Sequence, residues 1–380
     1  MRICAVTGSR ADWGLLKPVL TRLQGSAAQV QLVVTGSHLD ARFGHTVDDI
    51  QADGFTPDRR VTLGLEGDDA CAVATAMGNA VGGITAALHS LQPDVLLILG
   101  DRYEIFAAAQ AALLLRIPVA HIAGGDITEG AYDDAIRHAI TKLSHLHFTT
   151  NAQARRRVLQ LGEAPSRVLD CGSPGIDALL ETARWDRQQL QRALGFQLRQ
   201  RNLAITFHPV TLDHAEPEAQ LAPLLTALQA LGDTTGLIFS GANADNGGQR
   251  INQLLQEFVR TRDNACYCVS LGQAGYYSLV EQADLVVGNS SSGLYEAPSL
   301  HTPTLDIGTR QQGRLRGPSV QHVPNEADAI GRMIKLMLSH PPQDFSNPYG
   351  DGNASRCIAD ALLAIEDPRQ LLIKHFVEAH

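Results

Sequence analysis

Three aspartates in the first half of the chain have the type and spacing needed for acid/base chemistry. Asp101 directly follows one very apolar run, and Asp126 and Asp133 follow the next. If both runs are strands of one parallel sheet, the three carboxylates lie beyond its carboxyl edge, where ligands of such sheets bind. The pattern predicts an acid/base cluster. Two simpler roles stay open: Asp101 could cap the following helix, and Asp133 could pair with Arg137.

A loop after the first apolar run is a candidate anion site. It reads Thr-Gly-Ser-Arg-Ala-Asp-Trp-Gly over residues 7–14. This is neither a G-x-G-x-x-G fingerprint nor a P-loop, which argues against an ordinary dehydrogenase or P-loop nucleotidase. Backbone N–H groups at a helix start favour anions, and the guanidinium of Arg10 suits phosphate. Arg102 adds a cation beside Asp101, while Arg10 could instead pair with Asp12 on the surface.

The second half of the chain offers groups suited to a nucleotide. His208 ends an apolar run and could act as a general acid or a phosphate donor, or simply pack a loop. Ser290 and Ser291 stand between a strand and a helix start, where their hydroxyls could bind a diphosphate or merely cap the helix. Glu296, one turn later, could accept hydrogen bonds from a ribose diol. Arg310 follows the next strand and adds a cation.

The elements that must position these residues alternate between short β-branched runs and longer amphipathic helical patterns. This alternation is typical of parallel, doubly wound α/β sheets. Runs that are apolar on both sides suit buried parallel strands. The expected strands are Arg2–Val6, Val30–Val34, Asp94–Leu99, Pro118–Ile122, Val168–Gly172, Leu203–Phe207, Gly236–Phe239, Cys266–Val269, Leu285–Val287 and Thr304–Ile307.

The length of 380 residues suggests two domains. The pattern pauses at Gly-Ser-Pro-Gly, residues 172–175, which predicts a Rossmann-like domain over 1–172 and a nucleotide-binding one over 173–354. A closing helix over 355–380 is expected to return to the first domain. Ligands in such folds bind beyond the carboxyl ends of the strands, so we expect the active site in the cleft between the domains.

Composition excludes some classes of function. The net charge of -9 argues against nucleic-acid or anionic-membrane partners, which require a dense cationic face. No run reaches the roughly 18 uninterrupted apolar residues of a membrane helix. The N-terminus lacks a signal-peptide core. The six cysteines form no C-x-x-C pair, and we expect buried structural thiols, although Cys266 and Cys268 could bind a metal. These features predict a soluble, cytoplasmic protein.

Taken together, the motifs resemble the UDP-N-acetylglucosamine 2-epimerase family, particularly its hydrolysing branch from sialic- and legionaminic-acid-type pathways. The resemblance covers most of the chain, and the order and spacing of the motifs carry it. Its most specific segments are Gly100-Asp101-Arg102, residues 136–142 (Ile-Arg-His-Ala-Ile-Thr-Lys), Gly288-Asn289-Ser290-Ser291 and Gly308-Thr309-Arg310-Gln311.

The resemblance implies two Rossmann-like domains in the glycosyltransferase-B arrangement and a UDP-sugar substrate. It implies elimination of UDP to a glycal followed by hydration to N-acetylmannosamine, without a cofactor or metal, in a homodimer. Asp101 and Asp133 would be the acid/base groups. The residues implied to line the nucleotide and diphosphate site are Arg10, His208, Ser290, Ser291, Glu296 and Arg310.

One position departs from the family pattern. Many relatives read His-Ile-Glu-Gly-Gly where this chain has Ala123 in the third position. Alanine cannot transfer a proton, so the role passes to Asp126 or another group, or the substrate differs. A smaller side chain leaves room for a bulkier sugar, which makes a UDP- or GDP-linked diacetamido-trideoxyhexose the alternative substrate. A glycosyltransferase of the same form and a non-catalytic nucleotide-sugar sensor are the rival classes.

Overall fold

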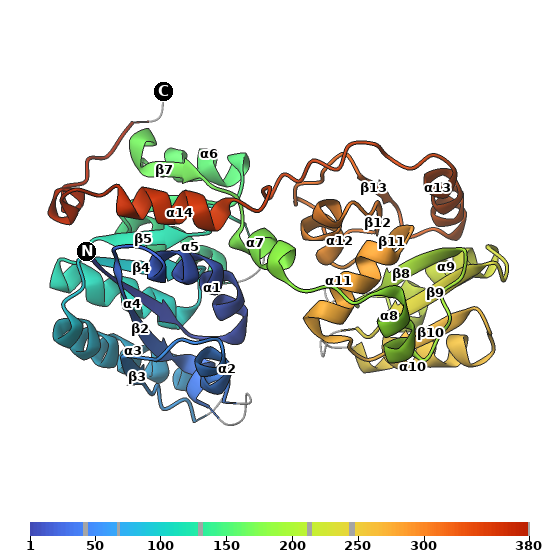
Figure 1. Ribbon diagram of the computed structural model, residues 1–380, viewed down its shortest axis with the longest axis horizontal. Helices are drawn as coiled ribbons and strands as arrows, with labels where there is room; N and C mark the ends of the chain where they lie inside the picture. The colour runs from blue at the N-terminus through green and yellow to red at the C-terminus, as the bar shows by residue number, and fades with distance from the viewer. Residues whose placement is uncertain (41–44, 67–68, 128–131, 211–214, 243–247, 379–380) are drawn as a thin grey trace. The chain divides into compact units, whose positions relative to one another are not determined.

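The computed structural model describes residues 1–40, 45–66, 69–127, 132–210, 215–242 and 248–378, which form two compact units. The first unit comprises Met1–Ala178 and Tyr349–His380, and the second comprises Leu179–Pro348. The red C-terminal helix therefore lies among the blue and cyan elements of the first unit (Figure 1). The sequence placed these transitions at residues 172 and 355.

The first unit is built on a seven-stranded sheet in the order β3-β2-β1-β4-β5-β6-β7, in which every neighbouring pair is parallel. Strand β4 shows why these residues form strands: Val95 and Leu97 enter one core cluster, while Leu96 and Ile98 enter the other. Burial on both faces requires an apolar side chain at nearly every position. The strands are β1 Arg2–Thr7, β2 Gln29–Thr35, β3 Arg59–Val61, β4 Val95–Leu99, β5 Val119–Ile122, β6 Leu146–Thr149 and β7 Val168–Asp170.

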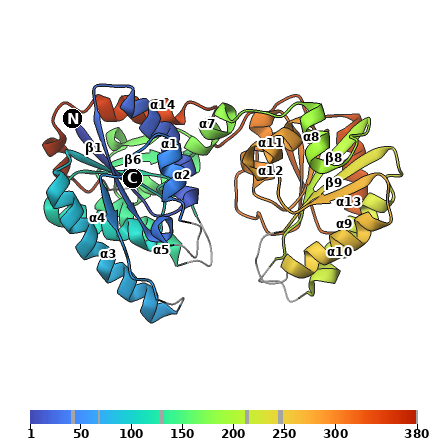
Figure 2. The ribbon, with the colours of Figure 1, turned by 60° about the horizontal axis from the view of Figure 1, so that its bottom comes forward.

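Helices cover both faces of this sheet (Figure 2). Side chains of α1, α2 and α14 enter the core cluster on one face, and those of α3, α4 and α5 enter the cluster on the other. The helices are α1 Arg10–Gln24, α2 Val47–Ala52, α3 Ala70–Leu91, α4 Tyr103–Leu115, α5 Asp133–Leu143, α6 Ala152–Gln160, α7 Pro174–Glu181 and α14 Ala354–Leu363, with 3-10 turns η1 Gly36–Leu39, η3 Pro165–Arg167 and η5 Pro368–Leu372.

The second unit repeats this plan with a six-stranded parallel sheet in the order β10-β9-β8-β11-β12-β13. Its core also lies on both faces, with α9, α10 and α13 on one and α8 and α11 on the other. The elements are β8 Arg201–Thr206, β9 Thr235–Ser240, β10 Ala265–Cys268, β11 Leu285–Gly288, β12 Thr304–Ile307, β13 Val320–Val323, α8 Arg187–Leu194, α9 Pro217–Gln229, α10 Gly248–Arg260, α11 Gly272–Gln282, α12 Ser292–Tyr295, η4 Ala297–Leu300 and α13 Ala327–Ser339.

One expectation from composition is corrected. Cys171, after β7, forms a disulfide with Cys357 of α14, and Cys71 is exposed, so the cysteines are not all buried thiols. Within the described residues, helix α3 is long and apolar enough to cross a membrane by length and composition alone. Thr75 and Asn79 interrupt its apolar run, so the helix does not contradict the expectation that no uninterrupted run is long enough. Part of α3 packs in the core of the first unit.

Candidate active site

Arg137 contacts two of the three predicted aspartates, Asp101 through its carboxylate and Asp126 through its backbone carbonyl. This arginine of α5 is buried, and its Nη2 forms an ion pair with Oδ2 of Asp101 at the end of β4. Its Nη1 donates to the carbonyl oxygen of Asp126 (2.6 Å) and to Oδ1 of Asp134 (3.2 Å). Arg102, rather than Asp101, occupies the N-cap position of α4, so the capping alternative for Asp101 is wrong.

The Asp101 carboxyl has an electrostatic environment suited to proton transfer. Burial raises its pKa, the positive charge of Arg137 opposes that rise, and the negative charge of Asp133 adds to it. Asp133 is the first residue of α5, and its charge acts on the Asp101 carboxyl. A carboxyl whose pKa is raised binds and releases protons closer to neutral pH than an exposed one.

Asp126 belongs to the same cluster through its backbone, while its side chain is directed to the loop after β6. Its Oδ1 accepts hydrogen bonds from Thr150 Oγ1 (2.7 Å) and Asn151 Nδ2 (3.3 Å). Burial raises the pKa of Asp126, and these two donors act in the opposite direction. Both of its functional groups are therefore engaged, the carbonyl by Arg137 and the carboxylate by Thr150.

Residues of β5 fix the backbone next to Asp101. His121 is fully buried, and its Nε2 is 2.8 Å from the carbonyl oxygen of Gly100. Burial lowers the pKa of His121 to about 3, so its ring is neutral and Nε2 donates to that carbonyl. Ala123 has a positive φ of 66° and donates its N–H to the Phe148 carbonyl (2.9 Å). The position that departs from the family pattern thus holds a left-handed backbone conformation.

Arg102 lies near two buried carboxylates, those of Asp12, which the sequence analysis named, and Glu104, which it did not. Its Nε is 2.5 Å from Oε1 of Glu104, which is completely buried. Asp12, in the first turn of α1, is also buried; burial raises its pKa to about 6, Arg102 lowers it and Glu104 raises it. Arg10 begins the same helix and is exposed, and Ser9 caps it by accepting from the Asp12 N–H (3.3 Å).

In the second unit, buried Asn289 joins three of the predicted loops, one through its side chain and another through its backbone carbonyl. Its Oδ1 accepts from the His208 N–H (2.7 Å), and its Nδ2 donates to the His208 carbonyl (2.8 Å). The Asn289 carbonyl accepts from Gln311 Nε2 (2.8 Å) and from Arg310 Nη1 (3.2 Å). His208 and Arg310, which follow β8 and β12, are therefore held beside the loop after β11.

The serine-rich segment begins at Gly288, a position where no residue with a side chain would fit. Gly288 has a φ of 140°, and a Cβ atom there would lie 1.9 Å from the Thr206 carbonyl oxygen. Ser290 Oγ accepts a long hydrogen bond (3.4 Å) from the Ser292 N–H, and Ser291 holds the N-cap position of α12. The Ser291 side chain makes no capping hydrogen bond to α12, so helix capping explains little of why serines occur here. Burial raises the pKa of Glu296, which directly follows α12.

A cavity of about 240 Å³ lies beside Ser290. It is lined by residues that follow β8, β9, β10 and β11, so it sits at the carboxyl edge of the second sheet. Burial raises the pKa of its Tyr276 to about 12, so the phenol stays neutral. The sequence did not predict the contributions of Gly241 and of residues 269–272, because they are backbone and small-residue contacts without a motif.

A model of the UDP-N-acetylglucosamine 2-epimerase family matches residues 21–363. The chain belongs to this family. A GDP/UDP-N,N'-diacetylbacillosamine 2-epimerase (hydrolyzing) of Campylobacter jejuni is 37% identical over 321 residues, covering 84% of this chain and 83% of the relative. A UDP-N,N'-diacetylbacillosamine 2-epimerase (hydrolyzing) of Legionella pneumophila is 34% identical over 374 residues, which is 98% of each chain.

The fold is shared with solved epimerase structures. The crystal structure of UDP-GlcNAc 2-epimerase from Neisseria meningitidis bound to UDP-GlcNAc matches with a TM-score of 0.78 and 22% identity, over 96% of this chain and 100% of that chain. The expected α/β class with two Rossmann-like units is confirmed. The chain is an epimerase-family protein whose predicted site residues fall at the carboxyl edges of two parallel sheets.

Proposed function

We propose that this protein is a hydrolysing 2-epimerase that converts UDP-N-acetylglucosamine to free N-acetylmannosamine and UDP. The observation that carries the proposal is the cluster in which Arg137 binds Asp101 and the Asp126 carbonyl, with Asp133 close enough to raise the pKa of Asp101. A glycosyltransferase has no need for such a cluster. The family membership and the hydrolysing activity in the names of both relatives support the same reading.

In the first step of the proposed reaction, a carboxylate removes the proton at C2. The C1–O bond breaks, UDP leaves with the bonding electron pair, and a 2-acetamidoglycal remains. In the second step, the oxygen of water bonds to C1 and a proton returns to C2 from the opposite face. The two faces require two separately placed groups, and we assign these roles to Asp101 and Asp133, with Asp126 contributing to the same cluster. The charge of Arg137 holds Asp101 in position.

In this proposal, a different set of residues binds the nucleotide. Ser290 and Ser291 donate to the diphosphate, and the Arg310 guanidinium balances its charge as UDP departs. Glu296 accepts hydrogen bonds from the ribose diol, and His208 contributes a donor to the phosphates or an acid for the leaving group. Arg10, Asp12 and Arg102 of the first unit remain predicted substrate-binding residues. A homodimer and a cytoplasmic location remain predictions.

A second candidate substrate is a UDP- or GDP-linked 2,4-diacetamido-2,4,6-trideoxyhexose. Two points favour it: Ala123 stands where the family resemblance implies glutamate, and both relatives are named as diacetylbacillosamine 2-epimerases. Under this alternative, the missing side chain at Ala123 makes room beside a bulkier sugar. The chemistry at C1 and C2 is the same for both substrates.

Proton NMR in deuterated water with purified protein tests the proposal. Release of UDP together with N-acetylmannosamine carrying deuterium at C2 is the expected result. UDP-N-acetylmannosamine in place of the free sugar would show a non-hydrolysing epimerase. Turnover of the diacetamido compound far above that of UDP-N-acetylglucosamine would establish the second candidate. Ligand-dependent stabilisation without any product from either compound would contradict the proposal and leave a sensor.

A further inference from the structure

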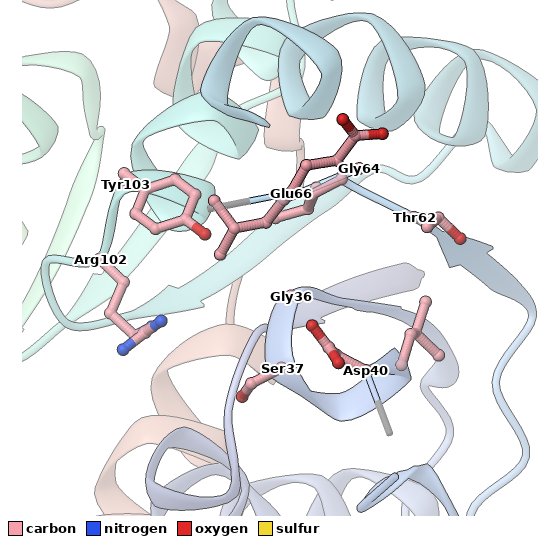
Figure 3. Close-up of a pocket in the computed structure, with 11 residues that line it drawn as sticks. Gly36, Ser37, Asp40, Thr62, Gly64, Glu66, Arg102 and Tyr103 are labelled. Atoms are coloured by element: carbon pink, nitrogen blue, oxygen red, sulfur yellow. The ribbon is translucent and has the colours of Figure 1, made fainter. Parts of the chain in front are cut away.

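A cavity of about 470 Å³ lies at the carboxyl edge of the first unit's sheet, and of its described lining residues only Arg102 has a role in the motifs or in the proposed function (Figure 3). Segments that follow β2, β3 and β4 line it, and two of its residues, Arg102 and Tyr103, directly follow Asp101. The cavity therefore begins one residue from the proposed acid/base cluster. This proximity makes it a candidate subsite for part of the sugar.

Most of the side-chain surface of this cavity is apolar. Leu39, Leu63, Leu65 and the ring of Tyr103 contribute to the lining, together with the backbone of Gly64. Figure 3 shows Arg102 and Tyr103 on one side of the cavity and Thr62 across from them. A ligand in this cavity must therefore present apolar groups and a small number of hydrogen-bonding atoms.

The charges around Arg102 favour a neutral ligand over an anion. Arg102 is the one cation among the lining residues that the structure describes, and the buried carboxylate of Glu104 already contacts its Nε. Asp12 is close enough for its charge to act on Arg102, and Glu66 adds a carboxylate to the lining. A phosphate or carboxylate would meet more negative than positive charge here. The Nη atoms of Arg102 remain suited to donate to a carbonyl oxygen.

We propose that this cavity receives the second acylamino group of a 2,4-diacetamido-2,4,6-trideoxy sugar and selects that sugar over N-acetylglucosamine. This inference rests on the hydrolysing 2-epimerase activity proposed above, with its second candidate as the substrate. The two sugars differ at C4, where acetamido replaces hydroxyl, and at C6, where methyl replaces hydroxymethyl. Both changes add apolar surface without adding charge. The acetamide carbonyl accepts from Arg102, and its methyl group contacts Leu65 and Tyr103.

Binding measurements with a filled cavity test this inference. Asp101→Asn is used as the background so that each nucleotide sugar stays intact during isothermal titration. We expect the background protein to bind the UDP-diacetamido sugar about tenfold or more tighter than UDP-N-acetylglucosamine, the effect of one well-placed apolar group. Leu65→Trp fills the cavity and removes this preference, while the affinities for UDP-N-acetylglucosamine and UDP stay within about twofold. Thr62→Trp, at an exposed lining position, tests the same point if Leu65→Trp does not fold.

The matched control is Leu114→Trp, because Leu114 is 73% exposed on α4 and does not line the cavity. It leaves all three affinities unchanged. Equal affinity of the background protein for the two nucleotide sugars would overturn the inference, as would a preference that survives in both filled variants or an equal loss for UDP itself. Failure of the proposed function is separate: the wild-type protein would then release UDP from neither compound, whatever the binding preference.

Discussion

Asn289 and His208 hold each other through two backbone-directed hydrogen bonds across 81 residues of sequence. The amide oxygen accepts from the His208 N–H and the amide nitrogen donates to the His208 carbonyl, so both functions of a buried side chain are used. The backbone carbonyl of Asn289 in turn accepts hydrogen bonds from the side chains of Gln311 and Arg310. One asparagine thus sets the relative positions of three loops assigned to the nucleotide.

Asn289→Asp places a carboxylate oxygen against the His208 carbonyl. We expect the free energy of unfolding to fall by about 1–3 kcal/mol, the cost of an unsatisfied buried group, and UDP affinity to fall by about tenfold or more. Asn264→Asp is the matched control, since Asn264 is also buried and donates to two backbone carbonyls, at the amino end of the same sheet. It lowers stability and leaves UDP binding intact. Urea unfolding and calorimetric titration separate the two effects, and equal loss of affinity in both variants would contradict the assignment.

Asp101→Asn removes one proposed proton-transfer group and keeps its shape. Turnover should fall by about 100-fold or more, as for other positioned acid/base groups, with UDP binding nearly unchanged. The control is Asp94→Asn, because Asp94 flanks the same strand at its other end and pairs there with Arg2. That variant should keep its activity. Wild-type-like turnover by Asp101→Asn would remove this residue from the mechanism.

The pKa of Asp101 should depend on the charge of Asp133. Its pKa is raised by burial and further by the charge of Asp133, so it should exceed the ordinary aspartate value of 3.8. In Asp133→Asn the repulsion disappears, the charged form of Asp101 becomes easier to form, and its pKa falls. Carbon-13 NMR of labelled aspartate carboxyls measures both values. An unchanged titration in Asp133→Asn would show that the two carboxylates are too far apart to share a substrate.

Three buried histidines should make the protein less stable as the pH falls. Burial lowers the pKa of His38 to about 4, of His121 to about 3 and of His145 to about 4. Histidine in the unfolded chain takes up its proton near pH 6.5, so between pH 6.5 and 4 the unfolded state binds more protons. Each histidine lowers the free energy of unfolding by about 1.4 kcal/mol per pH unit in that range. Asp12, with its pKa raised to about 6, protonates first in the folded state and offsets one of the three below pH 6.

Urea unfolding at several pH values between 7 and 5 measures this slope. His121→Gln should reduce the slope by about one proton, or about 1.4 kcal/mol per pH unit. His89→Gln, at an exposed position of α3, should leave it unchanged. A slope that is the same in both variants would show that His121 is not held neutral in the folded state.

Loss of the disulfide should lower stability. Cys171 and Cys357 are 186 residues apart, and a cross-link over so long a loop restricts the unfolded chain strongly. Cys357→Ser should lower the free energy of unfolding by about 2–5 kcal/mol under non-reducing conditions. The exposed Cys71→Ser should have no effect. Reducing agent should abolish the difference between wild type and Cys357→Ser; a difference that persists would come from packing instead.

Much of the fold was predictable because buried parallel strands leave a clear apolar signal. All ten expected strands are confirmed by the structure. The three that were missed are short and carry polar residues: β3 begins with two arginines, β6 contains His147, and β13 contains Gln321 and His322. They form strands because a neighbouring strand offers its hydrogen-bonding edge, which is a tertiary effect and leaves no periodic pattern.

The site was predictable only where chemistry and strand ends coincide. Asp101 stood out because it follows a fully apolar strand, yet for its partner Arg137 the sequence suggested only a possible pair with Asp133 on the same helix. Its ion pair with Asp101 spans 36 residues, which spacing rules for one helix cannot reveal. Glu104 was missed because a glutamate is rarely fully buried. Its burial depends on the nearby Arg102, and so on the folded loop.

The return of helix α14 to the first unit has a consequence for synthesis on the ribosome. Residues 179–348 are one continuous stretch, so the second unit can complete its sheet as soon as that stretch has emerged. The core of the first unit includes Ile358, Ala359 and Leu362 of α14, which are translated after the whole of the second unit. The first unit can therefore complete its core only after the second unit has been synthesised. Until α14 has emerged from the ribosome, the part of the apolar core that α14 covers stays exposed and prone to aggregation.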